Sequence, residues 1–138
     1  MRFAVLDTNV VISAGIKPKG APARIVMDWI LDGQVQTVTC PRISNEYLHV
    51  AAHAKFLRYK FPPFWLEYLI EESMLLPDPA PWPHRGPDPS DLPFLALAHA
   101  AGAWLVTGNL KHFPATVRGG IIVISPADYL AHLEGGEK

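Results

Sequence analysis

A short apolar run near the amino terminus constrains the fold of this 138-residue chain more than any other stretch. Residues 3–6 contain no polar side chain, which is typical of a parallel strand whose two faces are both covered. Asp7 ends the run, and Thr8 or Asn9 can cap a helix that begins at Val10. Ligands of open α/β proteins bind at the carboxyl edge of the sheet, so Asp7 is a candidate site residue as well as a candidate helix cap.

Strands and helices are expected to alternate along the rest of the chain. The predicted strands are residues 34–40, 74–76, 104–107 and 121–124, and the predicted helices are residues 21–32, 41–52, 62–74, 91–101 and a last one from Pro126, capped by Ser125. This alternation predicts a three-layer α/β fold, with a mostly parallel sheet of about four to five strands and helices on both faces. The length favours a single domain that spans residues 1–138.

The composition favours a globular protein of the cytoplasm. Apolar residues make up 49% of the chain and charged residues 18%, which excludes wholesale disorder. No apolar run is long enough to cross a bilayer, and the amino terminus lacks the pattern of a signal peptide. Cys40 is the single cysteine, so an internal disulfide and a cysteine-based zinc cluster are excluded, and a reducing compartment fits best.

Charge does not identify a nucleic-acid-binding protein by itself. The formal net charge is −1, with 12 basic and 13 acidic residues, so any site for a polyanion must be local. Phosphate contacts need Lys or Arg, and Arg42 and Lys111 are the basic residues nearest in sequence to the predicted sheet edge. Residues 77–89 form a proline-rich irregular segment, and a loop of this length suggests a functional role.

Four oxygen-bearing side chains that are distant in sequence are predicted at one edge of the sheet. Asp7 follows the first strand, and Glu46 lies near the start of the helix after the second. Asp91 begins the helix after the third strand, and Asn109 follows the fourth. A carboxylate cluster of this kind suits a hard cation, Mg²⁺ or Mn²⁺, which can activate a water and stabilise charge on a phosphate. The predicted reaction is phosphodiester hydrolysis.

Each of these residues also has a simpler explanation when it is taken alone. Glu46 could be a solvated helix residue, and Asp88 could shape the proline-rich turn. Thr8 and Thr107 could support the carboxylates by hydrogen bonds, although capping explains Thr8 equally well. The six histidines show no metal-ligand spacing, since the pair His49 and His53 lacks the rest of a zinc-helix motif.

Four stretches, LDTNVVIS, SNEYLHV, DPSDLPFLALAHAAGA and WLVTGNLKHF, resemble the motifs of PIN domains in their order and spacing. The likeness is strongest to VapC-like toxin components of toxin–antitoxin pairs. It implies a metal-dependent endoribonuclease that cuts single-stranded RNA, often as a homodimer, and that a protein antitoxin neutralises. The catalytic and metal-binding acids would be Asp7, Glu46 and Asp91. Asp88 matches an extra acid found in part of the family, and Asn109 stands where many members have a fourth Asp, which leaves the number of metals open.

Two alternative functions remain open beside this resemblance, and the sequence also predicts one interaction surface. A phosphatase of the haloacid dehalogenase type also has an Asp after its first strand, but it needs a second Asp where this chain has Asn9. A catalytically weakened PIN fold that only binds RNA or protein is supported by Asn109. The aromatic residues Phe61, Phe64, Trp65 and Tyr68 exceed what one amphipathic helix needs, so part of this surface is predicted to lie between subunits or under an antitoxin.

Overall fold

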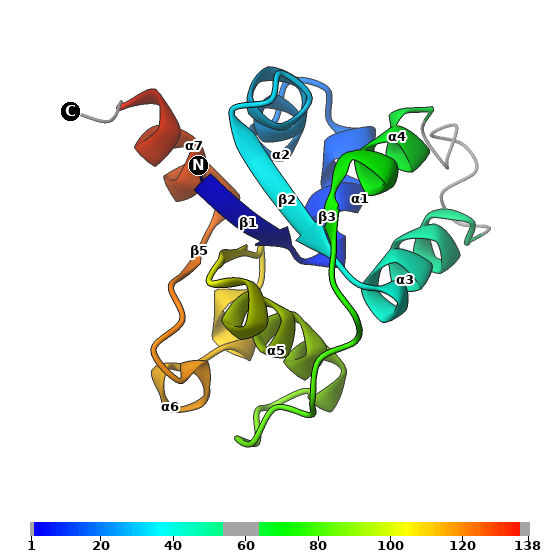
Figure 1. Cartoon of the computed structure of the whole chain (residues 1–138). Coiled ribbons are helices and arrows are strands. Elements are labelled where there is room, and N and C mark those ends of the chain that lie inside the picture. Colours follow the sequence, from blue (N-terminus) through cyan, green and yellow to red (C-terminus); the bar gives the residue numbers. More distant parts are fainter. Residues whose placement is uncertain (1, 54–63, 136–138) are drawn as a thin grey trace.

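The computed structural model describes residues 2–53 and 64–135, and these form a central parallel sheet with helices on both sides (Figure 1). The strands are β1 (Arg2–Leu6), β2 (Val35–Thr39), β3 (Met74–Leu75), β4 (Trp104–Val106) and β5 (Val123–Ile124). Their order in the sheet is β3-β2-β1-β4-β5, and within the described residues all neighbouring strands pair in parallel. The predicted α/β architecture is therefore confirmed. All carboxyl ends of the strands lie at one edge of the sheet.

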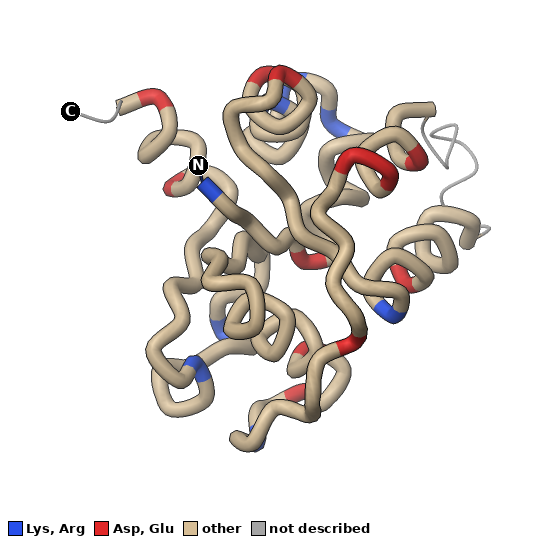
Figure 2. The backbone as a smooth tube through the Cα atoms, viewed as in Figure 1, with Lys and Arg blue, Asp and Glu red and all other residues tan. Residues whose placement is uncertain are grey.

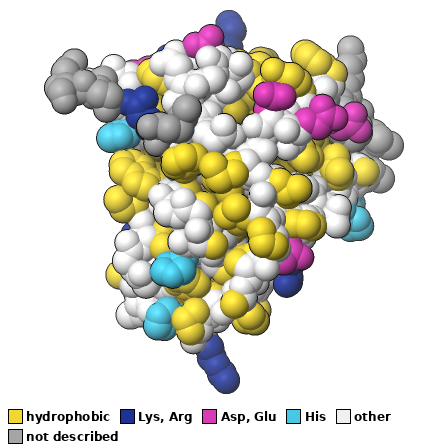
Figure 3. Space-filling view, viewed as in Figure 1, with side chains coloured by type: hydrophobic (Ala, Val, Ile, Leu, Met, Phe, Trp, Pro, Cys, Tyr) yellow, Lys and Arg dark blue, Asp and Glu magenta, His cyan; other side chains and the backbone are white. Residues whose placement is uncertain are grey.

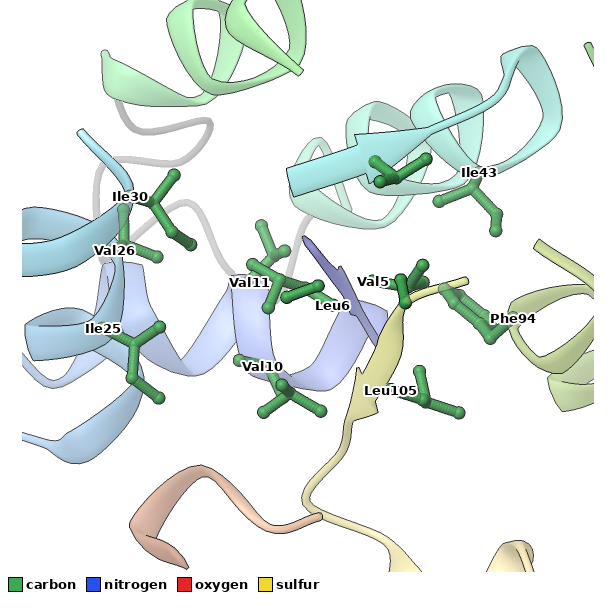
Figure 4. Packing of buried hydrophobic residues seen from close by; sticks show 14 of the residues in the cluster. Val5, Leu6, Val10, Val11, Ile25, Val26, Ile30, Ile43, Phe94 and Leu105 are labelled. Atoms are coloured by element: carbon green, nitrogen blue, oxygen red, sulfur yellow. The ribbon is translucent and has the colours of Figure 1, made fainter. Parts of the chain in front are cut away.

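The helices form the two outer layers. They are α1 (Thr8–Ile16), α2 (Ala21–Arg24), α3 (Pro41–Ala51), α4 (Trp65–Glu72), α5 (Leu92–Ala101), α6 (Ala115–Arg118) and α7 (Pro126–Glu134). Figure 4 shows α1 and α2 on one side of β1 and α5 on the other, while Val5 and Leu6 point toward opposite layers. Both residues are almost fully buried, as expected for a strand that is covered on both faces. None of the helices in the described part of the chain is long and apolar enough to cross a membrane.

The segment predicted as one helix over residues 21–32 has a different geometry. The four residues of α2 lead into a π-helical stretch, η1 (Ile25–Ile30), in which the Leu31 N–H donates to the Val26 carbonyl at 2.9 Å. The wider turn lets Ile25, Val26 and Ile30 all face the core, where each is buried. Propensity does not reveal this change of pitch, because the same residue types form both kinds of turn.

The caps at the two helices nearest the predicted site agree only in part with expectation. Asp7, rather than Thr8 or Asn9, is the residue before α1, and it makes no side-chain cap bond. A 3₁₀ turn, η3 (Pro89–Asp91), precedes α5, and its cap is Asp88, whose Oδ1 accepts from the backbone N–H of Ser90 at 3.0 Å. The prediction that Thr8 or Asn9 caps the first helix is therefore wrong, whereas Asp91 is the N-cap residue of α5, as predicted, although its side chain makes no cap bond. Asp88 and Asp91 consequently lie at the two ends of a single turn.

The predicted aromatic surface is smaller than the sequence suggested. Trp65 is only 5% exposed and belongs to the hydrophobic core, whereas Phe64 is 94% exposed and Tyr68 is 50% exposed. Phe61 and the predicted start of this helix at residues 62–63 lie outside the described residues. The last helix begins as predicted, since the Ser125 Oγ accepts from the backbone N–H of Asp128 at 3.1 Å.

Candidate metal centre

Asp7 stands at the carboxyl end of β1, where β4 and the start of α1 hold it. Its backbone N–H donates to the Val106 carbonyl at 2.9 Å, which extends the sheet pairing by one residue. Its Oδ2 accepts from the Thr107 hydroxyl at 2.7 Å and from the Asn9 side-chain amide at 3.2 Å. The carboxylate is 5% exposed. A buried carboxylate with these two donors has a fixed orientation before any ligand arrives.

The electrostatic surroundings of Asp7 show which acids are near it. Burial raises the pKa of Asp7, and the negative charges of Asp91 and Glu46 raise it further, whereas the Thr107 hydrogen bond lowers it. Carboxylates that follow β1, or come from α3 and η3, thus repel one another electrostatically although they are far apart in sequence. Like charges that approach in this way repel, and a bound cation removes that cost.

Glu46 reaches the same edge from α3. The Thr8 hydroxyl donates to the Glu46 Oε2, so the first residue of α1 orients this carboxylate. The buried Tyr47 hydroxyl donates to the Leu6 carbonyl at 2.6 Å and fastens α3 to the end of β1. Burial raises the pKa of Tyr47 above its usual range, and the charges of Asp7 and Glu46 add to this effect. Tyr47 therefore stays neutral and serves as a fixed donor.

Asp91, Asp88 and His112 form a second group of potential ligands at this edge. Their ligand atoms all lie within 4.8 Å of one another, and the His112 Nδ1 is 2.9 Å from the Asp91 Oδ2. Burial and the charge of Asp88 raise the pKa of Asp91, while His112 lowers it. Two ligands that stand side by side in an octahedral shell at about 2.1 Å from the metal are about 3.0 Å apart. The spacing of His112 and Asp91 therefore suits a hydrogen bond and equally suits a shared divalent cation.

The sequence did not indicate that His112 lies beside the acidic group. This histidine lies 21 residues beyond Asp91, so local spacing could not reveal it. The available signal was topological, because His112 ends the 3₁₀ turn η4 (Leu110–His112) that follows β4 at the carboxyl edge. His49 and His53 are exposed, in agreement with the surface position predicted for them.

Asn9 is a second residue whose role at the site the sequence did not indicate. Its side chain donates to Asp7 and accepts from the Gly108 N–H at 3.0 Å, so it links the segments that follow β1 and β4. A Cβ on Gly108 would stand 3.3 Å from the Asn9 Oδ1, a tight contact that favours glycine. The position where a phosphatase of the dehalogenase type needs an acid is thus occupied by a bridging amide.

The position of Asn109 is defined by its backbone. Its N–H donates to the Thr107 Oγ1 at 3.0 Å, and this hydroxyl in turn donates to Asp7. Within the described residues, the Asn109 side-chain amide makes no hydrogen bond to the acidic cluster. The turn after β4 therefore reaches the site through Thr107.

Acidic residues gather at the carboxyl edge of the sheet, and two exposed basic residues lie on the elements around it. Figure 2 shows an acidic segment just beyond the arrowhead of β1 in Figure 1, with others on α3 and before α5. Arg42 and Lys111 are exposed, on α3 and η4 respectively. Arg42 precedes Glu46 by one helical turn, and Lys111 is next to His112. Both basic residues are therefore exposed and close in sequence to acidic-edge residues.

One group of side chains at this edge fits a divalent cation. Among the described residues, Asp88, Asp91 and His112 have ligand atoms within 4.8 Å of one another. Asp7 and Glu46 stand outside this group, and the charges of Glu46 and Asp91 raise the pKa of Asp7. Mg²⁺ accepts carboxylate oxygen ligands, and Mn²⁺ accepts them together with an imidazole nitrogen. The group of Asp88, Asp91 and His112 could therefore hold a divalent cation.

Comparisons with known proteins agree with this architecture. A family model described as PIN domain matches residues 4–111. The chain is similar in structure to VapBC2 from Rickettsia felis bound to a DNA fragment from its promoter (TM-score 0.61, 16% identity, 89% of this chain and 98% of that chain). It is also similar to PAE2754 from Pyrobaculum aerophilum (0.57, 16%, 99% and 91%) and to FitAB bound to the IR36 DNA fragment (0.55, 18%, 89% and 94%). None of the proteins with curated descriptions matches.

Proposed function

Because this chain belongs to the PIN domain family, we propose that it is a metal-dependent endoribonuclease that hydrolyses phosphodiester bonds in single-stranded RNA. One arrangement supports the proposal. Asp88, Asp91 and His112 have ligand atoms within 4.8 Å of one another, and hydroxyl groups orient Asp7 and Glu46 nearby. The charges of Glu46 and Asp91, which come from separate elements, raise the pKa of the buried Asp7. A fold gains nothing in stability from such repulsion, so a cation that offsets it is the simplest reason for the arrangement.

The proposed metal ligands are Asp7, Glu46 and Asp91, with Asp88 and Asn109 as additional oxygen donors. When bound, Mg²⁺ or Mn²⁺ lowers the pKa of a coordinated water and stabilises charge on the phosphate. Thr107 and Thr8 act as positioning residues, because their hydroxyls donate to Asp7 and Glu46 respectively. Such partners keep a carboxylate in one orientation and so strengthen metal binding.

Arg42 and Lys111 are the proposed phosphate contacts. A chain with a net charge of −1 cannot attract RNA over a long range, so local cations must offset the repulsion between the phosphates and the acidic edge. Both residues are exposed and stand next to proposed ligands in sequence.

The cellular role we propose is that of the toxin of a toxin–antitoxin pair, acting in the cytoplasm. The names VapBC2 and FitAB denote complexes, and both were crystallised with DNA. By analogy, this chain would bind a protein antitoxin and form a homodimer. Phe64 and Tyr68 offer exposed aromatic surface for one of these contacts.

Cleavage of a labelled single-stranded RNA by the purified protein tests the proposal. We expect cutting in Mg²⁺ or Mn²⁺, none with a chelator, and a loss of more than about 100-fold in Asp91→Asn, because even residues that only support metal ligands cost up to that factor. Asp28→Asn, at an exposed acid of η1, is the matched control and should cut at the wild-type rate. Undiminished cleavage by Asp91→Asn would mean a contaminating nuclease or a different site.

A catalytically weakened binding module is the second candidate, and the uncharged Asn109 is what favours it. This alternative predicts that the wild-type protein binds the RNA without cutting it in either metal. The same assay therefore separates the two functions.

A further inference from the structure

A cleft of about 230 Å³ lies between the start of α3, the β3–α5 segment and α5, next to the proposed metal centre. We propose that this cleft holds a guanine base of the RNA, at the nucleotide adjacent to the bond that is cut. This inference rests on the proposed function, since it assigns the base that the same site would accept.

The walls of the cleft are apolar and well fixed. Leu92, Pro93 and Ala96 line it from α5, and residues 79–82 line it from the proline-rich segment. The Trp82 indole N–H donates to the Val117 carbonyl at 2.7 Å, which anchors this segment against α6. On the face shown in Figure 3, hydrophobic side chains are spread over the part of the molecule where this segment and α5 lie in Figure 1. Apolar walls favour an aromatic ring, and unpaired bases of single-stranded RNA bind by stacking and apolar contacts.

The cleft adjoins the carboxylates at two points. Leu92 directly follows Asp91, and Arg42 lies one helical turn before Glu46 on α3, a separation of about 5–6 Å between Cβ atoms. A base stands at a comparable distance from its own phosphate. A phosphate held at the metal centre can therefore place an adjoining base in this cleft.

Two charged side chains line the cleft and determine which base fits. The Asp78 Oδ1 accepts from the backbone N–H of Arg42 at 2.9 Å, which places this carboxylate at the start of α3. A carboxylate only accepts hydrogen bonds, and a guanidinium only donates them. Guanine offers two adjacent N–H donors on its Watson–Crick edge and two acceptors, O6 and N7, beside them. Asp78 and Arg42 complement these two groups. In this arrangement the Arg42 guanidinium contacts the base instead of a phosphate, and Lys111 remains the proposed phosphate contact.

The other bases complement this pair less well. The N–H of uracil stands between two carbonyl oxygens, which a carboxylate repels. Adenine offers one amino group and no O6 acceptor, and cytosine offers one amino group beside acceptors. A preference for guanine therefore follows from Asp78 and Arg42 acting together.

A simpler explanation of Asp78 is that it only caps α3. The substitution Asp78→Asn separates the two, because the asparagine oxygen can still accept from the Arg42 N–H while the charge is lost and a donor is added. Arg42→Gln likewise keeps the backbone N–H of the cap. Lys19→Gln removes one positive charge beyond the end of α1, away from the carboxyl edge, and is the control for net charge.

The experiment measures binding and does not depend on cleavage. Fluorescence anisotropy with the cleavage-deficient Asp7→Asn chain in Mg²⁺ compares oligouridine that carries one central guanine with the same strand that carries adenine. We expect roughly tenfold tighter binding of the guanine strand, as for one good bidentate base contact. Adding Asp78→Asn or Arg42→Gln should abolish this preference, whereas adding Lys19→Gln should retain it.

Several outcomes overturn the inference. Equal binding of the two strands, absence of binding to either strand, or a guanine preference that survives Asp78→Asn would each show that the cleft does not read guanine. Failure of the proposed function is recognised separately, because the wild-type protein would then leave RNA uncut whatever the binding preference.

Discussion

The two edges of the sheet contain contrasting groups of buried polar residues. At the carboxyl edge, burial and the like charges of Asp91 and Glu46 raise the pKa of Asp7. At the amino edge, burial raises the pKa of Tyr129 to about 12, and the positive charge of Arg2 opposes that shift. The first group consists of charges that repel one another, whereas the second keeps a neutral phenol beside a cation.

The aromatic rings at the amino edge also pack against one another. Trp104 packs against His132 at 4.8 Å and against Tyr129 at 6.0 Å between ring centroids, and these residues line a cleft of about 190 Å³. Ring contacts of this kind stabilise a fold without any ligand. The contrast shows that a cleft alone does not identify a site. The carboxyl edge is the functional candidate because its charges remain unbalanced.

Removing a hydroxyl that orients a carboxylate at the carboxyl edge should cause the largest change, a loss of metal affinity that has no counterpart at the amino edge. Thr107→Val keeps the shape of the side chain but loses the hydrogen bond to Asp7, so we expect metal affinity to fall by about 10–100-fold. Calorimetric titration with Mn²⁺ measures this change. Thr37→Val is the matched control, since Thr37 is also buried in the sheet and bonds another hydroxyl, that of Ser73, away from the site. Equal losses in both variants would indicate a general loss of stability instead.

Adding a negative charge at the carboxyl edge should increase metal affinity, by a smaller factor than the loss expected for Thr107→Val. If Asn109 faces the metal, Asn109→Asp supplies a fourth principal carboxylate and should tighten Mg²⁺ binding several-fold. Metal titration of the two proteins under identical conditions tests this expectation. Unchanged affinity would place Asn109 outside the ligand set, as a turn residue that only bonds Thr107 through its backbone.

The smallest expected effect is on the stability of the metal-free protein. The pKa of Asp7 is raised in the folded state, so the folded chain binds its proton more tightly than the unfolded chain. Stability is therefore lost as pH rises from the ordinary pKa of 3.8 through the raised one. Asp7→Asn removes this loss and should raise the Tm at neutral pH by a few degrees in the presence of a chelator.

The control for this stability effect lies at the other edge of the sheet. Tyr129→Phe removes the buried hydroxyl beside Arg2, where no repulsion exists to be relieved. Its Tm should not rise. If Asp7→Asn were less stable than the wild type without metal, the repulsion at the carboxyl edge would be too weak to support the proposal.

Topology was easier to predict from this sequence than hydrogen-bond partners. The apolar residues 3–6 and the alternation of elements sufficed for a parallel sheet, and this topology brings Asp7, Glu46 and Asp91 to one edge. The position of His112 after β4 was a topological signal, but its contact with Asp91 could not be predicted, because that contact depends on the exact path of the turn after β4. That path is set by tertiary contacts, including the bond from Gly108 to Asn9, and not by local propensity.

Local helix geometry was predicted less well for a related reason. The π-helical stretch η1 arises because three apolar residues face the core at once, which is a packing effect. Likewise, Asp88 caps a 3₁₀ turn before α5 that the sequence did not indicate, while Asp91 is the N-cap residue of α5 itself. Where several neighbours have similar propensity, the surrounding structure decides between them.

Direct titration of Mn²⁺ into wild-type protein and Glu46→Gln tests the central claim, that acids from separate elements form one cation site. Glu46→Gln keeps an oxygen that can accept from Thr8, so the fold should remain while one charge is lost. Glu71→Gln, at an exposed residue of α4, is the control with the same chemical change. The account predicts saturable binding to the wild type and to Glu71→Gln, and a loss of about tenfold or more in Glu46→Gln. Equal Mn²⁺ affinity in all three proteins would contradict it.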